Sequence, residues 1–101
     1  MPKIFFETVA GGRKPYVASL RKLLERFRLP FDAGDRIGIK LHWGERGNKG
    51  YLPPDYAREI VAWLRAGKAK PFVFDTTVLY SGGRRTAADS LKTAADHGYT
   101  P

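Results

Sequence analysis

The side chains best suited to chemistry gather in two short stretches of the sequence. One imidazole and two carboxylates stand out among them, at His42, Glu45 and Asp75. An imidazole with two carboxylates suits iron, manganese or zinc, so these three residues are the predicted ligands of a divalent metal. Their spacing matches no closed metal motif, and a second interpretation stays open. In it, His42 hydrogen-bonds a loop carbonyl and Asp75 pairs with Lys40 or caps its own loop.

The same two stretches can also hold a small anion. Residues 44–50 (GERGNKG) are rich in glycine and include Arg46 and Lys49, so their backbone N–H groups can cradle a phosphate. The loop is neither a Walker loop nor a dinucleotide-binding fingerprint, and a loop with no ligand is the alternative. The residues expected to contact the ligand are Lys40, Gly44, Gly47, Asn48, Thr76 and Arg84.

Arg84 belongs to a segment, residues 81–86 (SGGRRT), that comes just before a helical pattern. Glycines followed by arginines at a helix start suit an anionic group, because the helix dipole and the guanidinium act together. In the alternative interpretation Arg84 is solvated or pairs with Glu45 or Asp89. His97 falls in the last turn of the same helix, where a positive imidazole is favourable, and is interpreted as structural.

Three strand-like runs and three helical patterns must position these residues. The expected strands, rich in aromatic and β-branched residues, cover residues 3–9, 36–43 and 70–75. The expected helices, with apolar residues at helical spacing, cover residues 16–27, 53–66 and 86–97. Each connection between strands is long enough to contain a helix, which favours parallel strands with right-handed crossovers.

The order βαβαβα predicts the α/β class, with a small parallel sheet in a three-layer arrangement. We expect one partial domain over residues 1–101, a fragment of a larger doubly wound domain. Ligands of such sheets bind beyond the carboxyl ends of the strands. Alternation puts Lys40 and His42 on one face of the second strand, and the third strand brings Asp75 to the same edge. An open sheet edge also favours a homodimer.

Composition excludes several classes of protein. The 101 residues contain no cysteine, which rules out a disulfide scaffold, a cysteine nucleophile and a cysteine-ligated zinc or iron–sulfur site held by this chain alone. No apolar run approaches 18 residues, so a membrane span is not expected, and the N-terminal sequence lacks a signal-peptide pattern. We therefore expect a cytoplasmic protein.

The charge leaves a second function class open. The 18 basic and 10 acidic residues give a net charge of +8, which favours anionic partners. A non-catalytic module that binds nucleic acid or an acidic protein is the alternative to a small-ligand site. If that alternative holds, the first helix should carry a continuous basic stripe, formed by Arg21, Lys22, Arg26 and Arg28.

Three segments carry a family resemblance. They are GIKLHWGERGNKGYLPP (residues 38–54), AKPFVFDTTVLYSGGR (residues 69–84) and AADSLKTAADHGY (residues 87–99). Together they resemble, in register, the motifs of the uncharacterised iron–sulfur-center protein family known as domain of unknown function 362. The sequence departs from those motifs at Thr77, Val78 and Ser90, where the family usually has Asn, Thr and His.

The resemblance implies an α/β fold with a site at the two polar loops. It implies a [4Fe–4S] cluster for the longer family members, which carry a cysteine-containing ferredoxin-like region. This chain has no cysteine to ligate such a cluster. No substrate or reaction follows from the resemblance.

Overall fold

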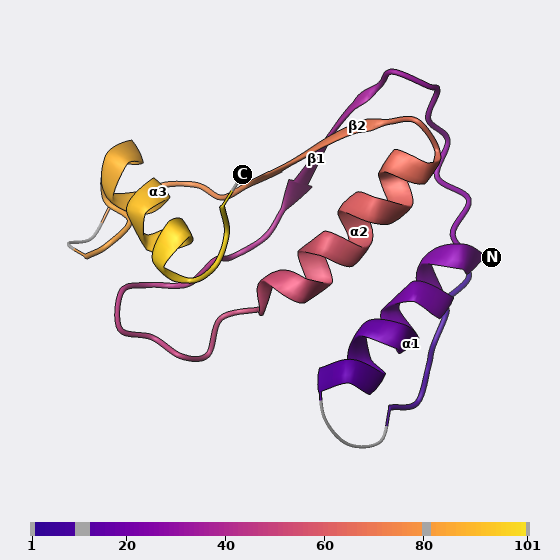
Figure 1. Ribbon diagram of the computed structural model, residues 1–101, viewed down its shortest axis with the longest axis horizontal. Coiled ribbons are helices and arrows are strands. Elements are labelled where there is room, and N and C mark those ends of the chain that lie inside the picture. The colour runs from indigo at the N-terminus through magenta and orange to yellow at the C-terminus, as the bar shows by residue number, and fades with distance from the viewer. Residues whose placement is uncertain (1, 10–12, 80–81, 101) are drawn as a thin grey trace. The chain divides into compact units, whose positions relative to one another are not determined.

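The computed structural model of the chain describes residues 2–9, 13–79 and 82–100. Its elements follow in the order α1 (Arg13–Arg26), β1 (Arg36–Lys40), α2 (Pro54–Ala66), β2 (Lys70–Phe74) and α3 (Ala87–Asp96) (Figure 1). The strands β1 and β2 lie side by side in a two-stranded parallel sheet. The mixed α/β class is confirmed. No helix of the described part of the chain is long and apolar enough to cross a membrane.

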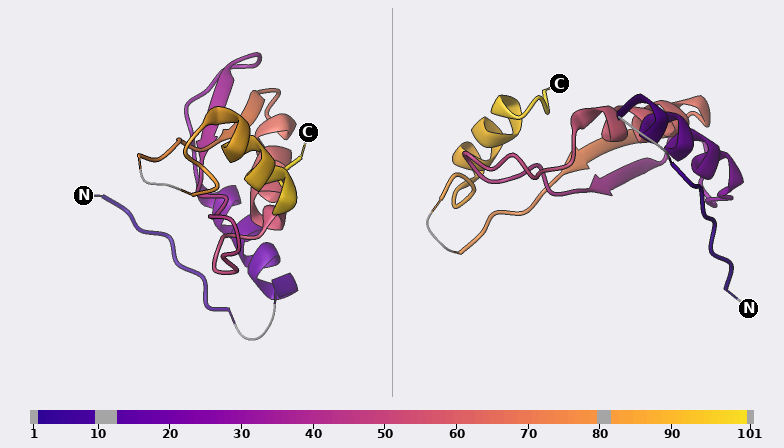
Figure 2. Two further views of the ribbon diagram at one scale, coloured as in Figure 1. Left: turned by 90° about the vertical axis from the view of Figure 1, so that its left-hand side faces the viewer. Right: turned by 90° about the horizontal axis from the view of Figure 1, so that it is seen from below.

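The predicted first strand differs from the structure. The strands of the described residues are β1 and β2, and residues 3–9 run as an extended chain outside the sheet (Figure 2). Phe5 packs edge-on against Phe27, with ring centroids 5.5 Å apart, and Glu7 pairs with Arg26 at 3.3 Å. Alternating apolar and polar side chains indicate only that one face of an extended segment is covered. Here side-chain contacts at the end of α1 cover that face, where we had expected a neighbouring strand.

The chain divides into two compact units. Unit 1 comprises Met1–Ile37 and Asp55–Pro71, and unit 2 comprises Gly38–Pro54 and Phe72–Pro101. The helices α1 and nearly all of α2 belong to unit 1, and α3 belongs to unit 2. Each strand begins in unit 1 and ends in unit 2, so the loops that follow both strands lie in unit 2.

Unit 1 has a small apolar core. Its buried side chains are Leu24, Ala57, Leu64 and Ala69. The turn after α2 departs from the usual glycine cap, because the residue with left-handed backbone angles is Lys68 (φ 64°). Gly67 serves close packing instead: a Cβ there would lie 2.7 Å from Cζ of Phe31.

The two strands alternate as the sequence predicts. Ile37 and Ile39 are half-buried, while Gly38 and Lys40 are exposed. The Leu41 N–H donates to the Phe74 carbonyl at 3.1 Å, just where both strands end. The parallel order therefore opens the two following loops at one edge of the sheet, where the sequence placed the candidate site.

Helix α3 begins and ends as its sequence predicts. The Thr86 side chain caps the amino end by accepting a hydrogen bond from the Asp89 N–H at 3.1 Å. His97 is the C-cap residue of α3, and Gly98 follows it with left-handed backbone angles (φ 91°). The face of α3 that carries Ser90, Thr93 and Ala94 is buried.

Candidate functional site

Asp75 lies directly after β2, and its side chain is only 2% exposed. One carboxylate oxygen, Oδ1, accepts hydrogen bonds from Lys40 Nζ at 2.9 Å and from the Thr76 N–H at 2.7 Å. The other oxygen, Oδ2, pairs with the Arg84 guanidinium and lies 3.2 Å from His42 Nδ1. The predicted convergence of Lys40, His42 and Asp75 is therefore present within unit 2, and Arg84 lies in contact with it.

The surroundings of Asp75 keep its carboxyl group charged. Burial raises the pKa of Asp75, because it removes water from the charged form. Hydrogen bonds from Lys40 and the Thr76 N–H lower the pKa by favouring the carboxylate. The charge of Arg84 lowers it further, and the net result is a pKa of about 2, below the ordinary value of 3.8. Asp75 therefore acts as a fixed negative charge at the strand end.

Arg84 is the buried cation of the site, with a side chain that is 7% exposed. Its Nη1 contacts Asp75 and lies 2.7 Å from His42 Nδ1, and its Nε lies 3.7 Å from Glu45 Oε2. The three side chains that the sequence suggested as metal ligands thus surround a guanidinium. No group of three or more His, Asp or Glu in the described ranges is arranged to hold a metal ion.

Glu45 ties the two loops together. Its Oε1 accepts hydrogen bonds from the Arg46 N–H at 3.0 Å and from the Gly83 N–H. The approach requires glycine at position 83, since a Cβ there would lie 2.7 Å from both Glu45 Oε1 and Thr93 Oγ1. Thr93 on α3 donates to the Gly83 carbonyl at 2.6 Å. The carboxylate, the loop before α3 and α3 itself are therefore held in one arrangement.

The contacts of His42 assign its tautomer. Arginine only donates hydrogen bonds, so Arg84 Nη1 at 2.7 Å makes His42 Nδ1 an acceptor. An imidazole whose Nδ1 accepts carries its proton on Nε2. The side chain of His42 is 58% exposed, and Nε2 is the ring nitrogen that remains for a ligand. His42 therefore offers an N–H donor close to the half-exposed ammonium of Lys40.

The other predicted ligand-binding residues shape the loops. Gly44 is buried against Tyr51 and His97, where a Cβ would lie 2.6 Å from Tyr51 Cβ. Gly47 adopts left-handed angles (φ 78°) in the turn closed by the hydrogen bond from Asn48 N–H to the Glu45 carbonyl. The Asn48 side chain accepts from the Gly50 N–H at 2.7 Å. Each of these contacts stays within the chain.

The aromatic residues around the glycine loop are packing residues. The rings of Tyr51 and His97 stack with centroids 3.9 Å apart, and His97 Nδ1 lies 2.7 Å from the Trp43 carbonyl. Trp43 is buried and packs against Tyr99, with ring centroids 6.4 Å apart. This arrangement agrees with the interpretation of His97 as structural.

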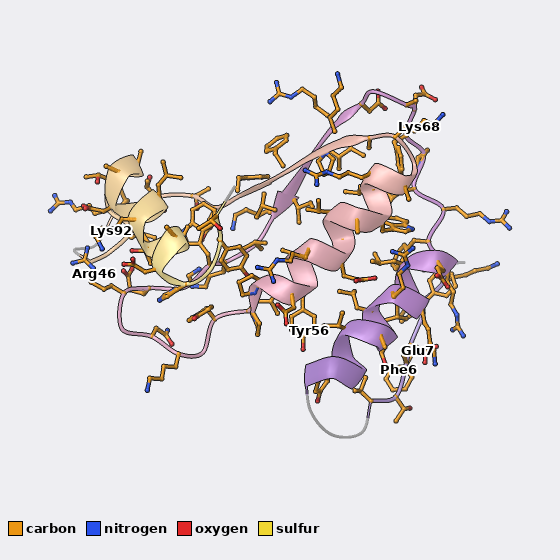
Figure 3. All side chains as sticks on the ribbon, in the orientation of Figure 1. Phe6, Glu7, Arg46, Tyr56, Lys68 and Lys92 are labelled. Atoms are coloured by element: carbon orange, nitrogen blue, oxygen red, sulfur yellow. The ribbon has the colours of Figure 1, made fainter. Side chains whose placement is uncertain are left out.

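Two of the four basic residues expected to form a stripe on the first helix are paired with carboxylates of unit 1. Arg21 pairs with Glu25 at 3.3 Å and with Glu59 at 3.4 Å, and Arg26 pairs with Glu7. In unit 2, Arg46 projects from the glycine loop and Lys92 from α3 (Figure 3). Lys92 is itself paired with Asp96 at 2.9 Å. These ion pairs match part of the positive charge locally.

Comparison with known proteins identifies the chain by family. Residues 37–101 match the family model described as Domain of unknown function (DUF362). No curated protein and no solved structure matches the chain. The matched residues are more than half of the sequence and include every residue of the cluster around Asp75 and Arg84. The chain therefore belongs to the DUF362 family.

Proposed function

We propose that Lys40 and His42 bind a small anion, with a phosphate or carboxylate as the recognised group. The contact between Arg84 Nη1 and His42 Nδ1 at 2.7 Å carries this proposal, because it leaves Nε2–H as the donor that His42 offers. The carboxylate of Asp75 is buried, so its acceptor oxygens do not face a ligand. Two donors without a matching acceptor suit the oxygens of an anion.

Lys40 keeps capacity for such a ligand. An ammonium group has three N–H donors. Lys40 Nζ uses two of them, on Asp75 Oδ1 at 2.9 Å and on the Leu41 carbonyl at 3.3 Å. The third donor is available, and the side chain is 49% exposed. Asp75 and Arg84 then position the two ligand-binding side chains and do not touch the ligand themselves.

The tautomer also favours an anion over a metal ion at His42. A metal would need the lone pair of Nε2, which requires the proton to move to Nδ1. That proton would point toward Asp75 but would also face the N–H groups of Arg84, 2.7 Å away. For the iron–sulfur chemistry implied by the family resemblance, we propose that any cluster is ligated from outside these 101 residues, which contain no cysteine.

A titration with inorganic phosphate tests the proposal. Amide chemical shifts of the ¹⁵N-labelled 101-residue chain are followed at constant pH and ionic strength. Phosphate should shift the amide signals around Lys40, His42 and Thr76, and Lys40→Ala and His42→Ala should each weaken binding at least fivefold. Lys92→Ala is the matched control, because Lys92 is an exposed lysine of unit 2 that lies on α3, outside both loops. Equal weakening by Lys40→Ala and Lys92→Ala would mean general charge attraction and would reject the site.

A further inference from the structure

Two aromatic rings lie on the same exposed face of the sheet as Lys40. Phe72 and Phe74 are 43% and 37% exposed, and their ring centroids lie 5.8 Å apart. They are the exposed alternate residues of β2, as Gly38 and Lys40 are of β1. This pair of rings is called the aromatic platform below.

Gly38 lets the platform extend over β1. A Cβ at position 38 would lie 2.9 Å from Phe74 Cε1, which is closer than real Cβ contacts, and 3.0 Å from Phe72 Cζ, which is tighter than most of them. Both rings therefore reach across the backbone of the neighbouring strand. Lys40 stands two residues beyond Gly38, about 7 Å along the strand. The hydrogen bond from Leu41 N–H to the Phe74 carbonyl fixes Phe74 beside this end of β1.

We propose that the aromatic platform and the Lys40–His42 donors form one site for a planar aromatic ring that carries a phosphate, as in a nucleotide. The inference rests on the proposed function, since the donors hold the phosphate. The platform adds a surface on which the ring stacks, an interaction typical of Phe side chains that bind nucleobases.

Charge complementarity favours this occupant over an apolar partner. A purely apolar surface laid on the platform would cover part of Lys40 and His42 without offering them an acceptor, which is costly. A phosphorylated ring supplies an apolar face for Phe72 and Phe74 and anionic oxygens for the two donors. One small molecule thus satisfies both parts of this sheet face.

Three probes separate the parts of the proposed site. Dissociation constants of inorganic phosphate, adenosine 5′-monophosphate and adenosine are measured by the same amide titration. We expect the monophosphate to bind roughly tenfold more tightly than phosphate, toward the low end of the gain from one stacked base. Phe74→Ala should abolish this advantage and leave the affinity for phosphate unchanged. Gly38→Ala, which displaces the rings, should reduce the advantage as well.

Matched variants keep the result interpretable. Phe6→Ala removes an exposed phenylalanine of unit 1, labelled in Figure 3, and should leave all three affinities unchanged. Phe74→Leu retains an apolar side chain without an aromatic face, so it should lose the tenfold advantage even if Phe74→Ala fails to fold.

Each outcome of the titrations decides the question. Equal affinities for the monophosphate and for phosphate would overturn the inference and leave the proposed function standing. No binding of either anion would reject the proposed function as well. If adenosine alone bound as tightly as the monophosphate, and Lys40→Ala changed neither affinity, the single combined site would be refuted.

Discussion

The two compact units contain charge in very different settings. Unit 1 has twelve basic and six acidic residues, against six and four in unit 2, so most of the net charge of +8 belongs to unit 1. The cations in the ion pairs of unit 1 are long side chains that are 40% or more exposed, as in Arg21 with Glu25 at 3.3 Å and Arg58 with Asp55 at 3.0 Å. In unit 2 the central pair, Asp75 and Arg84, is buried.

The difference shows that burial marks the site better than the number of charges does. Exposed ion pairs are screened by water and contribute little, whereas each buried charge must be matched by a partner. Unit 2 also lies entirely within the residues that match the DUF362 family, while α1 lies outside them. The buried ion pair of Asp75 and Arg84 therefore lies in the part of the chain that matches the family model.

Removing Arg84 should cause the largest loss of stability. Arg84→Met leaves the carboxylates of Asp75 and Glu45 without their buried cation, and breaking a buried pair in this way costs about 3–5 kcal/mol. The measurement is the free energy of unfolding in urea at pH 7. Arg26→Met in unit 1 is the control and should cost less than about 1 kcal/mol. Equal costs would show that burial does not distinguish the two units.

Acid should weaken unit 2 through Asp75. Because the pKa of Asp75 in the folded chain is about 2, below the ordinary 3.8, its charge stabilises the folded state above about pH 4. That contribution, about 2 kcal/mol, is lost as the pH falls from 4 toward 2. Unfolding free energies of the native chain and of Asp75→Asn should converge over this range. Curves that stay parallel down to pH 2 would contradict the assignment.

Crowding the Glu45 carboxylate should have a smaller effect. In Gly83→Ala the new Cβ meets Glu45 and Thr93 at 2.7 Å, and both partners are held by hydrogen bonds, so we expect a loss of about 1–2 kcal/mol. Gly67→Ala in unit 1 meets only the far end of the Phe31 ring at 2.7 Å and should cost less. Thermal unfolding of both variants measures the difference, and the reverse order would contradict it.

The smallest effect should come from the ion pair between Glu7 and Arg26. A double-mutant cycle with Glu7→Ala and Arg26→Ala should give a coupling energy of about 0.2–1 kcal/mol at low salt. In 1 M salt the coupling should vanish, because the Debye length is then about 3 Å. A coupling that survives high salt would mean that this pair resembles the buried pair of unit 2.

The sequence predicted the helices well and one of the strands wrongly. Apolar side chains at helical spacing and end signals such as Thr86 and Gly98 are local, so they locate α3 to within a residue. In residues 3–9, the alternation of apolar and polar side chains indicates that one face is covered. It does not indicate which part of the molecule covers that face. Backbone pairing depends on tertiary contacts that the local pattern does not contain.

The sequence predicted where the site lies better than it predicted the contacts between its side chains. Strand order and alternation were enough to bring Lys40, His42 and Asp75 to one edge. The alternatives kept open for Asp75 and Arg84, pairing with Lys40 and with Glu45, are confirmed. The central place of Arg84 depends on how the loop before α3 packs, which no local pattern encodes. The aromatic platform was missed, although Gly38 at an otherwise regular strand position was its signal.

The long sequence separation inside the buried cluster has a consequence for how the chain folds. His42 and Arg84 are 42 positions apart, and Glu45 and Gly83 are 38 apart. During synthesis the carboxylate of Glu45 must stay hydrated until Arg84 has left the ribosome, because burying a charged group without its partner is unfavourable. Non-local contacts of this kind form slowly, whereas the helical turns of α1 need only near neighbours. Closure of the buried cluster should therefore follow the formation of the helices, and the period before it closes is when the nascent chain most needs protection.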